Sequence, residues 1–295
     1  MFSGALFAVA LIAQTAGPVA HPALTAAFSR TVTPETYADL ARLADAGVPG
    51  ARALYEGFGV LGLAGRGRDF PAACRAWESA AAVSAEAAHF TAECYQNGHA
   101  GVSDLPRAIE LYRQAGEGGF PKSLCALGNM YMAGDGVPAD PARAAALCRR
   151  GAEAGDIDAQ TDLGNFYLAG KGVPQDTAEA RRWYERAAAY NQRNAAFVLG
   201  QMYWNGDTVE KDNDEAVRLW LIAWEAGRKD AALLLARAYL VEGLRDPNNH
   251  DEEILRESAA WYDQAILEMT DPAERAEAEA QRDALRVVLA ALDAN

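Results

Sequence analysis

One set of residue types recurs along the chain at a fixed step of 36 residues. The step is kept by tyrosine, leucine, glycine, aspartate and alanine, each in its own phase. The tyrosines are Tyr95, Tyr131, Tyr167, Tyr203 and Tyr239, and the leucines are Leu127, Leu163, Leu199 and Leu235. A fixed period of this size indicates an array of stacked structural repeats, none of which buries its apolar face alone. We therefore predict a solenoid.

Each repeat contains the pattern of two helices joined by a short turn. The first, helix A, includes segments such as LGNMYMAG and LGNFYLAG, in which leucine and tyrosine four residues apart fall on one helix face. The glycine after each leucine lacks a side chain, which allows a neighbouring helix to approach closely. The structural positions that we assign are Leu127, Gly128, Tyr131, Leu163, Gly164, Tyr167, Leu199, Gly200 and Tyr203. The fold class is therefore all-α, with stacked helix-turn-helix repeats.

The turn between the two helices has its own periodic residues. Glycine ends helix A at Gly98, Gly134, Gly170 and Gly206, and a glycine there can adopt the left-handed conformation that closes a helix. Aspartate precedes the second helix, helix B, at Asp104, Asp140, Asp176 and Asp212. We expect these carboxylates to accept hydrogen bonds from the first amides of helix B.

The whole pattern, LGxxYxxGxGVxxDxxxAxxWYxxAA, resembles the SEL-one-like repeat family, which is related to the tetratricopeptide repeats. The resemblance covers roughly residues 34 to 270 and is specific, because several positions agree in phase in successive units. It implies a right-handed α/α superhelical solenoid. It also implies adaptor or regulatory roles in assembly and signalling, with no reaction attached.

The repeats predict the following organisation. We expect a half-repeat helix at 34–50, six repeats over 51–270, and a capping helix at 271–295 that begins at Asp271-Pro272. The repeats are expected at 51–86, 87–122, 123–158, 159–194, 195–230 and 231–270. Six extra residues interrupt the last repeat in the turn from Gly243 to Asp251, and such loops often carry partner contacts.

The N-terminal residues are typical of an exported protein. Met1 to Ala13 is an apolar run, too short to span a bilayer, so we predict a signal peptide over 1–20 and a flexible linker over 21–33. The expected location is periplasmic or secreted. No Lys or Arg precedes the run, and neither Ala16 nor Ala20 ends a small-x-small site. An uncleaved apolar tail, in a cytoplasmic or membrane-attached protein, is the alternative.

Four cysteines allow two bridges. Cys74 and Cys94 lie on adjacent expected helices, as do Cys125 and Cys148, so the pairs Cys74–Cys94 and Cys125–Cys148 are geometrically reasonable. The alternative is that all four are small buried apolar side chains. No CxxC pair is present to suggest a zinc site.

Charge limits the class of partner. The net charge is −14, and the last fifty residues hold thirteen acidic and four basic side chains. Nucleic acid is therefore an unsuitable partner, since phosphate binding needs a basic surface. The acidic C-terminal region is either a docking surface for a basic protein or a solvated face.

No motif indicates catalysis, a metal or a cofactor. The Gly-x-Gly pairs lie in repeat turns, and Gly170-Lys171 is not followed by Ser or Thr as in a phosphate-binding loop. The histidines lack ligand spacing, and Asp246 to Glu253 lacks the glycine and closing glutamate of a calcium loop. We expect a non-enzymatic protein. A hydrolase of cell-wall or β-lactam substrates, proposed for cysteine-rich relatives, is the alternative.

A row of polar residues is the best candidate for a binding surface. The residue two after each periodic leucine position points away from the helix seam, and these positions hold Glu93, Asn129, Asn165, Gln201 and Arg237. Related helical repeats bind peptides on their inner, helix A surface. We predict that this row, flanked by Trp204, binds a protein or peptide on the concave face. The alternative is that the amides face water.

Overall fold

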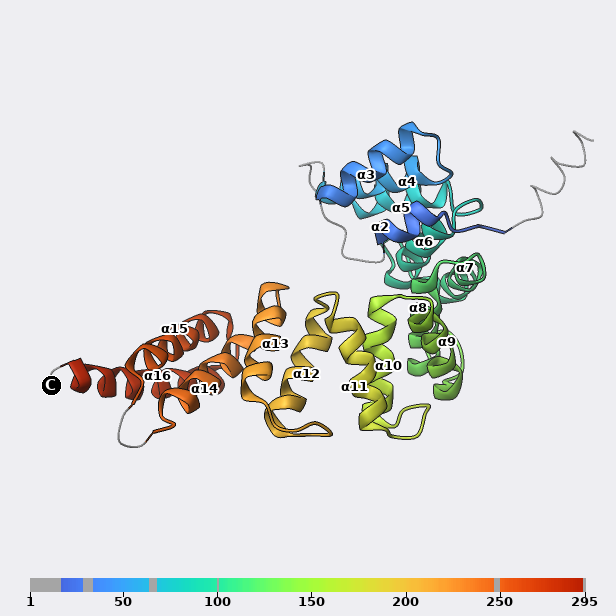
Figure 1. The fold of residues 1–295 in the computed structure, drawn as a ribbon. Coiled ribbons are helices and arrows are strands. Elements are labelled where there is room, and N and C mark those ends of the chain that lie inside the picture. Colours follow the sequence, from blue (N-terminus) through green and yellow to red (C-terminus); the bar gives the residue numbers. More distant parts are fainter. Residues whose placement is uncertain (1–16, 29–33, 64–67, 100, 247–249, 294–295) are drawn as a thin grey trace, which may run out of the picture. The chain divides into compact units, whose positions relative to one another are not determined.

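The computed structural model describes residues 17–28, 34–63, 68–99, 101–246 and 250–293. The described chain forms helices, and its β structure is limited to an isolated bridge between Val19 and Ser84. It divides into two compact units, residues 1–175 and 176–295, which are described separately (Figure 1). The all-α class predicted from the period is therefore confirmed, with helical hairpins stacked in chain order inside each unit.

The first unit contains the half-repeat and the first repeats. Its elements are α2 (Pro22–Phe28), α3 (Pro34–Asp45), α4 (Ala51–Phe58), the π-helical turn η1 (Gly59–Leu63), α5 (Phe70–Glu78), α6 (Ala85–Asn97), α7 (Leu105–Glu117), α8 (Pro121–Ala133), α9 (Pro141–Glu153) and α10 (Ile157–Ala169). Each helix from α3 to α9 packs on the next along the chain, and the A helices α8 and α10 also contact each other.

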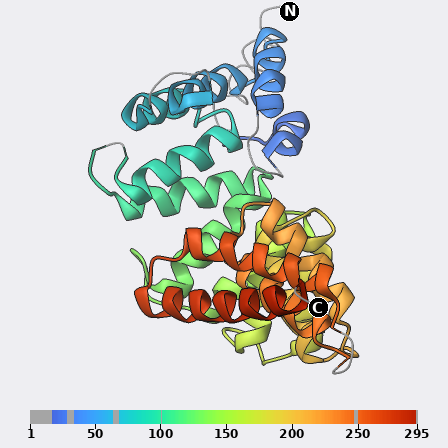
Figure 2. The ribbon, with the colours of Figure 1, turned by 90° about the vertical axis from the view of Figure 1, so that its left-hand side faces the viewer.

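The second unit continues the same alternation. Its helices are α11 (Thr177–Ala188), α12 (Arg193–Asn205), α13 (Asn213–Glu225), α14 (Ala231–Gly243), α15 (Glu252–Glu268) and α16 (Pro272–Asp293). In Figure 1, α11, α12 and α13 stand side by side in chain order. The dark red α16 runs along α15 and buries Ala278, Leu285 and Leu289 (Figure 2). The division between the units falls inside the expected fourth repeat, between α10 and α11.

The periodic residues of the turns behave as the pattern predicts. Gly98, Gly134, Gly170 and Gly206 all have positive φ, between 64° and 80°, and each ends an A helix. Asp104 and its equivalents each accept a hydrogen bond from the amide three residues later. The turn chemistry therefore repeats with the period.

The glycine after the periodic leucine is required by close packing. A Cβ on Gly128 would lie 2.8 Å from the carbonyl oxygen of Ala144, and a Cβ on Gly200 would lie 2.6 Å from Nε1 of Trp220. The preceding leucines, such as Leu163 at 0% exposure, are buried. The largest buried side chains of the seam belong to B helices and include Tyr112, Tyr184 and Trp220.

The periodic tyrosines are half-buried rather than enclosed in the seam. Tyr95 lies under the guanidinium of Arg107 at 4.4 Å from the ring centroid, and Tyr131 lies under Arg143 at 4.2 Å. Both arginines come from the first turn of the following B helix and are themselves 36 residues apart. A cation–π contact therefore covers one face of each of these two rings, a role that the period alone did not predict.

The linker predicted over residues 21–33 is wrong for its first part. Residues 22–28 form α2, and its Leu24 and Phe28 are 0% and 2% exposed. The ring of Phe28 lies 5.5 Å from that of Phe58 and 5.0 Å from that of Phe90. Apolar packing against α4 and α6 orders this short helix, which sequence propensity alone does not favour. Residues 29–33 and residues 1–16, which include the apolar run, lie outside the described residues.

Two disulfides join the cysteines in the pairs named above. Cys74 of α5 is bonded to Cys94 of α6, and Cys125 of α8 is bonded to Cys148 of α9. Each bridge therefore links two helices that are neighbours in the chain. No helix among the described residues combines the length and hydropathy needed to cross a bilayer.

Candidate binding surface

One side of helices α6, α8 and α10 carries polar residues in two periodic rows. The first row places Lys122 and Asp158 near the starts of α8 and α10, and the second places Glu93, Asn129 and Asn165 about two turns further on. Asp162 lies between the rows on α10. We call these six residues the polar strip. The strip exists because the 36-residue step puts equivalent positions of successive A helices on the same side.

Contacts between α8 and α10 hold the strip together. Asn129 donates from Nδ2 to Oδ2 of Asp162 at 2.9 Å, and Nζ of Lys122 lies 2.7 Å from Oδ2 of Asp158. Asn129 is therefore engaged with its neighbouring repeat, which differs from the picture of an amide that faces only water or a partner. Asn165 is exposed on the same side of α10.

The strip is partly buried, and burial shifts the pKa values of its charged groups. Burial raises the pKa of the Asp162 carboxyl, an effect that the hydrogen bond from Asn129 partly offsets. Burial opposes the charge on Lys122, but Asp158, together with Asp156 and Glu93, outweighs burial and raises the pKa of the ammonium group. Charges in such a setting interact more strongly with a bound group than charges in bulk water do.

A buried serine and a buried histidine lie next to Glu93 of the strip. His89 Nδ1 lies 2.9 Å from Ser123 Oγ, and His89 Nε2 lies 3.3 Å from Oε1 of Glu93. The residue types are those of a nucleophile, a base and an orienting acid. However, Ser123 and His89 are 0% and 1% exposed, so a substrate has no access to the hydroxyl group. The hydrogen bond between Ser123 and His89 satisfies Oγ of Ser123 and Nδ1 of His89 within the core.

Sequence reasoning missed this buried set, although a signal was present. Ser123 stands in phase with Ala87, Ala159 and Ala195, which are all 0% exposed. A hydroxyl group at a position that is otherwise alanine needs a hydrogen-bond partner in the core. His89, on the neighbouring helix α6, is that partner. A departure from the repeat consensus at a buried phase was therefore the informative feature.

The remaining predicted site residues lie in the second unit. Gln201 is half-buried on α12. The ring of Trp204 lies 5.6 Å from that of Trp220, and Nζ of Lys211 lies 5.2 Å from the centroid of the Trp204 ring. Trp204 therefore has packing and cation–π partners in its own unit. Whether the row of Glu93, Asn129 and Asn165 continues to Gln201 stays a prediction.

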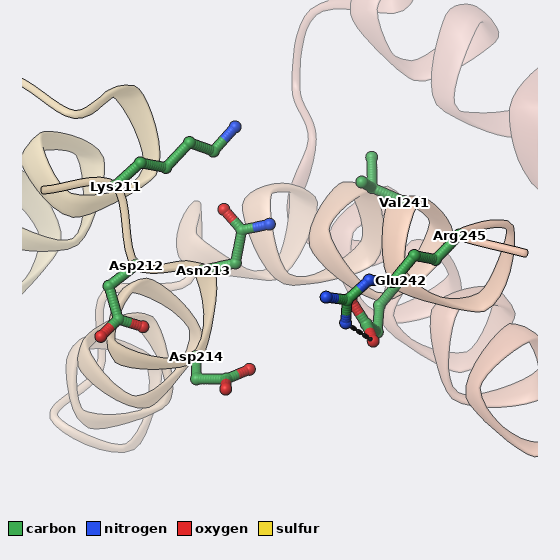
Figure 3. A pocket seen from close by; sticks show the side chains of 7 residues that line it. All are labelled: Lys211, Asp212, Asn213, Asp214, Val241, Glu242 and Arg245. Atoms are coloured by element: carbon green, nitrogen blue, oxygen red, sulfur yellow. Dashed lines mark hydrogen bonds and ion pairs between the residues drawn. The ribbon is translucent and has the colours of Figure 1, made fainter.

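The second unit also has a polar hollow at the start of α13. Its volume is about 390 Å³, and its walls come from α13 and the end of α14 (Figure 3). Arg245 is paired with Glu242 at 2.9 Å, and Oδ1 of Asn213 is buried without a hydrogen-bond partner. The lining residues are Lys211, Asp212, Asn213, Asp214, Val241, Glu242 and Arg245. The mixture of both charges selects no single ligand class.

Stacked two-helix repeats, three of whose A helices carry the polar strip, define a helical-repeat protein. Four consecutive segments, residues 85–120, 121–156, 157–189 and 193–227, match the Sel1 repeat family. The matched segments are SEL-one-like repeats, as the sequence pattern predicted. Each match begins at the first residue of an A helix, two residues before the repeat start inferred from the sequence.

Solved structures agree with this assignment. A Sel1 repeat protein from Oxalobacter formigenes is 25% identical, with a TM-score of 0.63 over 78% of this chain and 98% of its own. A protective antigen of uropathogenic Escherichia coli with an SLR fold is 26% identical, with a TM-score of 0.61. That match covers 87% of this chain but only 53% of the antigen chain. Comparison with curated protein sequences finds no significant match.

Proposed function

We propose that the protein is a non-enzymatic scaffold that binds a protein or peptide on the A-helix side of its repeats. The observation that carries this proposal is the run of four Sel1 repeats, because such repeats generally form scaffolds for protein interactions. A stack of repeats also offers an extended surface, which suits recognition of another chain better than it suits catalysis.

The polar strip is the proposed contact region in the first unit. It has three carboxylates, from Glu93, Asp158 and Asp162, against the single ammonium group of Lys122. It also presents the amide of Asn165, which can pair with main-chain groups of an extended segment. We propose that the partner contributes a segment with basic side chains, because electrostatic complementarity gives specificity and speeds association.

We further propose that the scaffold acts outside the cytoplasm. An apolar N-terminal run and two disulfides support export, since disulfides persist in oxidising compartments and are rare in the cytosol. In a bacterial cell this corresponds to the periplasm or to secretion.

The proposal is tested by affinity capture with a strip variant. Wild type and the triple variant Asn129→Ala, Asp162→Asn and Asn165→Ala are used as bait under native, low-salt conditions. We expect wild type to retain a defined set of proteins, and the variant to lose at least about tenfold of their recovery. The loss of two or three polar contacts at about 1 kcal/mol each gives that magnitude.

The matched control changes Arg150 to Ala and Glu153 to Gln on the exposed surface of helix B α9. This control should recover the same proteins as wild type. If the strip variant recovered the same proteins as wild type in equal amounts, the strip would not be the contact region. Recovery that does not fall with added salt would remove the basic character of the partner.

The hydrolase alternative gains no support from the Ser123, His89 and Glu93 set, because its hydroxyl and imidazole groups are closed to solvent. Turnover of a β-lactam reporter by the purified protein would revive this alternative. We expect no turnover above that of a heat-denatured sample.

A further inference from the structure

The N-terminal segment, residues 17–28, is bonded to the repeats through its main chain. Val19 forms a parallel bridge with Ser84, in which the amide of Ala85 donates to the carbonyl of Val19 at 3.2 Å. The amide of Ala20 donates to the carbonyl of Gly118, at the end of α7, at 2.8 Å. Residues on both sides of the Ala20 position therefore take part in the fold.

Pro18 fits against a glycine. A Cβ on Gly118 would lie 2.0 Å from the carbonyl oxygen of Pro18, and Pro18 is buried. Gly118 has φ of −71°, which any residue adopts, so its own backbone does not demand a glycine. The close approach of Pro18 provides the physical reason for glycine at this position.

A buried carboxylate fixes the next residues of the segment. Glu86 is 0% exposed, and its Oε1 accepts from the main-chain amide of His21 and from Oγ1 of Thr25, both at 2.9 Å. Ser84 donates to the other oxygen at 2.9 Å. A buried carboxylate is costly unless it is hydrogen-bonded, so loss of the N-terminal segment would leave Glu86 with a single donor of these three.

These contacts help to locate the bond at which a leader peptide is cleaved. This inference rests on the proposed export. Of the two alanines that the sequence offers as the last leader residue, cleavage after Ala20 would discard Pro18, Val19 and Ala20. Cleavage after Ala16 would retain all three. Each of the discarded residues contacts α6 or the end of α7.

We propose that residues 17–28 stay in the mature protein as part of its fold, and that a leader peptidase hydrolyses the bond between Ala16 and Gly17. Water adds across this amide, so that Ala16 takes the new carboxylate and Gly17 takes the new ammonium group. Ala16 supplies the small side chain that leader peptidases require directly before the cut bond, although Gln14 stands two residues earlier, where a second small side chain is usual.

The intact chain is expressed in an export-competent bacterial host, purified from the exported fraction, and its intact mass is measured. The expected mass is that of a chain beginning at Gly17. A chain beginning at His21 or later would overturn the proposal, and so would an exported chain that keeps Met1. The affinity capture described above tests binding independently of the cleavage site, because it compares variants of the polar strip on α8 and α10.

Hydrogen exchange of the purified protein tests the contacts directly. The amides of Ala20 and His21 should exchange slowly, because both donate to acceptors in the repeats. Exchange at the rate of an unstructured peptide would overturn the role of the segment even if the cut lies at Gly17.

A matched substitution adds a stability measurement. Gly118→Ala is compared in two chains, one beginning at Gly17 and one beginning at His21. In the longer chain the new Cβ should displace Pro18 and lower the unfolding midpoint by about 2–4 °C or more. In the shorter chain the same change should cost much less. Equal shifts in both chains would contradict the contact.

Discussion

Glu93 shows how one residue can serve both the core and the surface. It occupies the phase of Asn129 and Asn165, but its carboxylate contacts the buried imidazole of His89 at 3.3 Å. Although burial tends to raise it, His89 and then Lys122 hold the pKa of the Glu93 carboxyl below its ordinary value of 4.5. Glu93 therefore connects the strip to the buried core through its contact with His89.

The lowered pKa of Glu93 predicts a pH-dependent contribution to stability. A depressed carboxyl pKa stabilises the fold above the ordinary value, and the contribution is lost as pH falls through the folded value. Wild type should therefore be more stable than Glu93→Gln at about pH 6, with the difference fading below about pH 4. Urea unfolding at both pH values measures this. If the stability difference between wild type and Glu93→Gln grew as the pH fell, the prediction would be contradicted. The exposed substitution Glu153→Gln is the control.

Gly128 tests close helix packing at a single atom. Its added Cβ would meet the Ala144 carbonyl at 2.8 Å and the Cys148 sulfur at 3.0 Å, both on α9. Gly128→Ala should therefore destabilise the first unit by about 1–3 kcal/mol, despite the better helix propensity of alanine. Chemical unfolding is compared with Ala133→Ser, at the exposed end of the same helix. A Gly128→Ala protein as stable as wild type would refute the contact.

At the scale of helices, each hairpin combines local signals with bonds to its neighbour. Asp140 caps α9 by accepting from the amide of Arg143 at 2.9 Å, and Gly134 ends α8. The disulfide between Cys125 and Cys148 joins these two helices. Caps and turns were predictable because they depend on residues adjacent in sequence. The cation–π cover on the tyrosines depends on packing between helices and was not predicted.

The disulfides predict a response to reduction. Replacing Cys125 and Cys148 by alanine should cost about 3 kcal/mol, the amount expected for a loop of this order of length. A reductant should lower the unfolding midpoint of wild type and leave the variant without any of the four cysteines unchanged. Urea unfolding with and without reductant measures both. An unchanged wild type, or an equal fall in the cysteine-free variant, would contradict the bridges.

At the scale of the molecule, the 36-residue period predicted the stacked hairpins and their order. The period is visible in the sequence because each repeat packs the same residue types at equivalent positions, such as Leu163 in the seam. The same phase placed Asn129 and Asn165 of the polar strip away from the seam, whereas Lys122, Asp158 and Asp162 were not predicted.

What the sequence did not predict depends on contacts between distant residues. Residues 21–28 were predicted as part of a flexible linker, yet α2 is ordered by Phe58 and Phe90, which lie 30 and 62 residues further on than Phe28. The pairing of Asn129 with Asp162 likewise crosses from one repeat to the next. Periodicity reports the average repeat, so it does not reveal contacts made by residues that depart from it.

The central claim is that the A-helix side of the repeats binds another protein, and photo-crosslinking tests it most directly. A photoreactive amino acid is placed at position 165 on α10, and in a second protein at position 150 on α9, and both are irradiated in living cells. We predict discrete adducts with another protein from position 165 and none from position 150. Absence of adducts at 165, or the same adducts from both positions, would contradict the account.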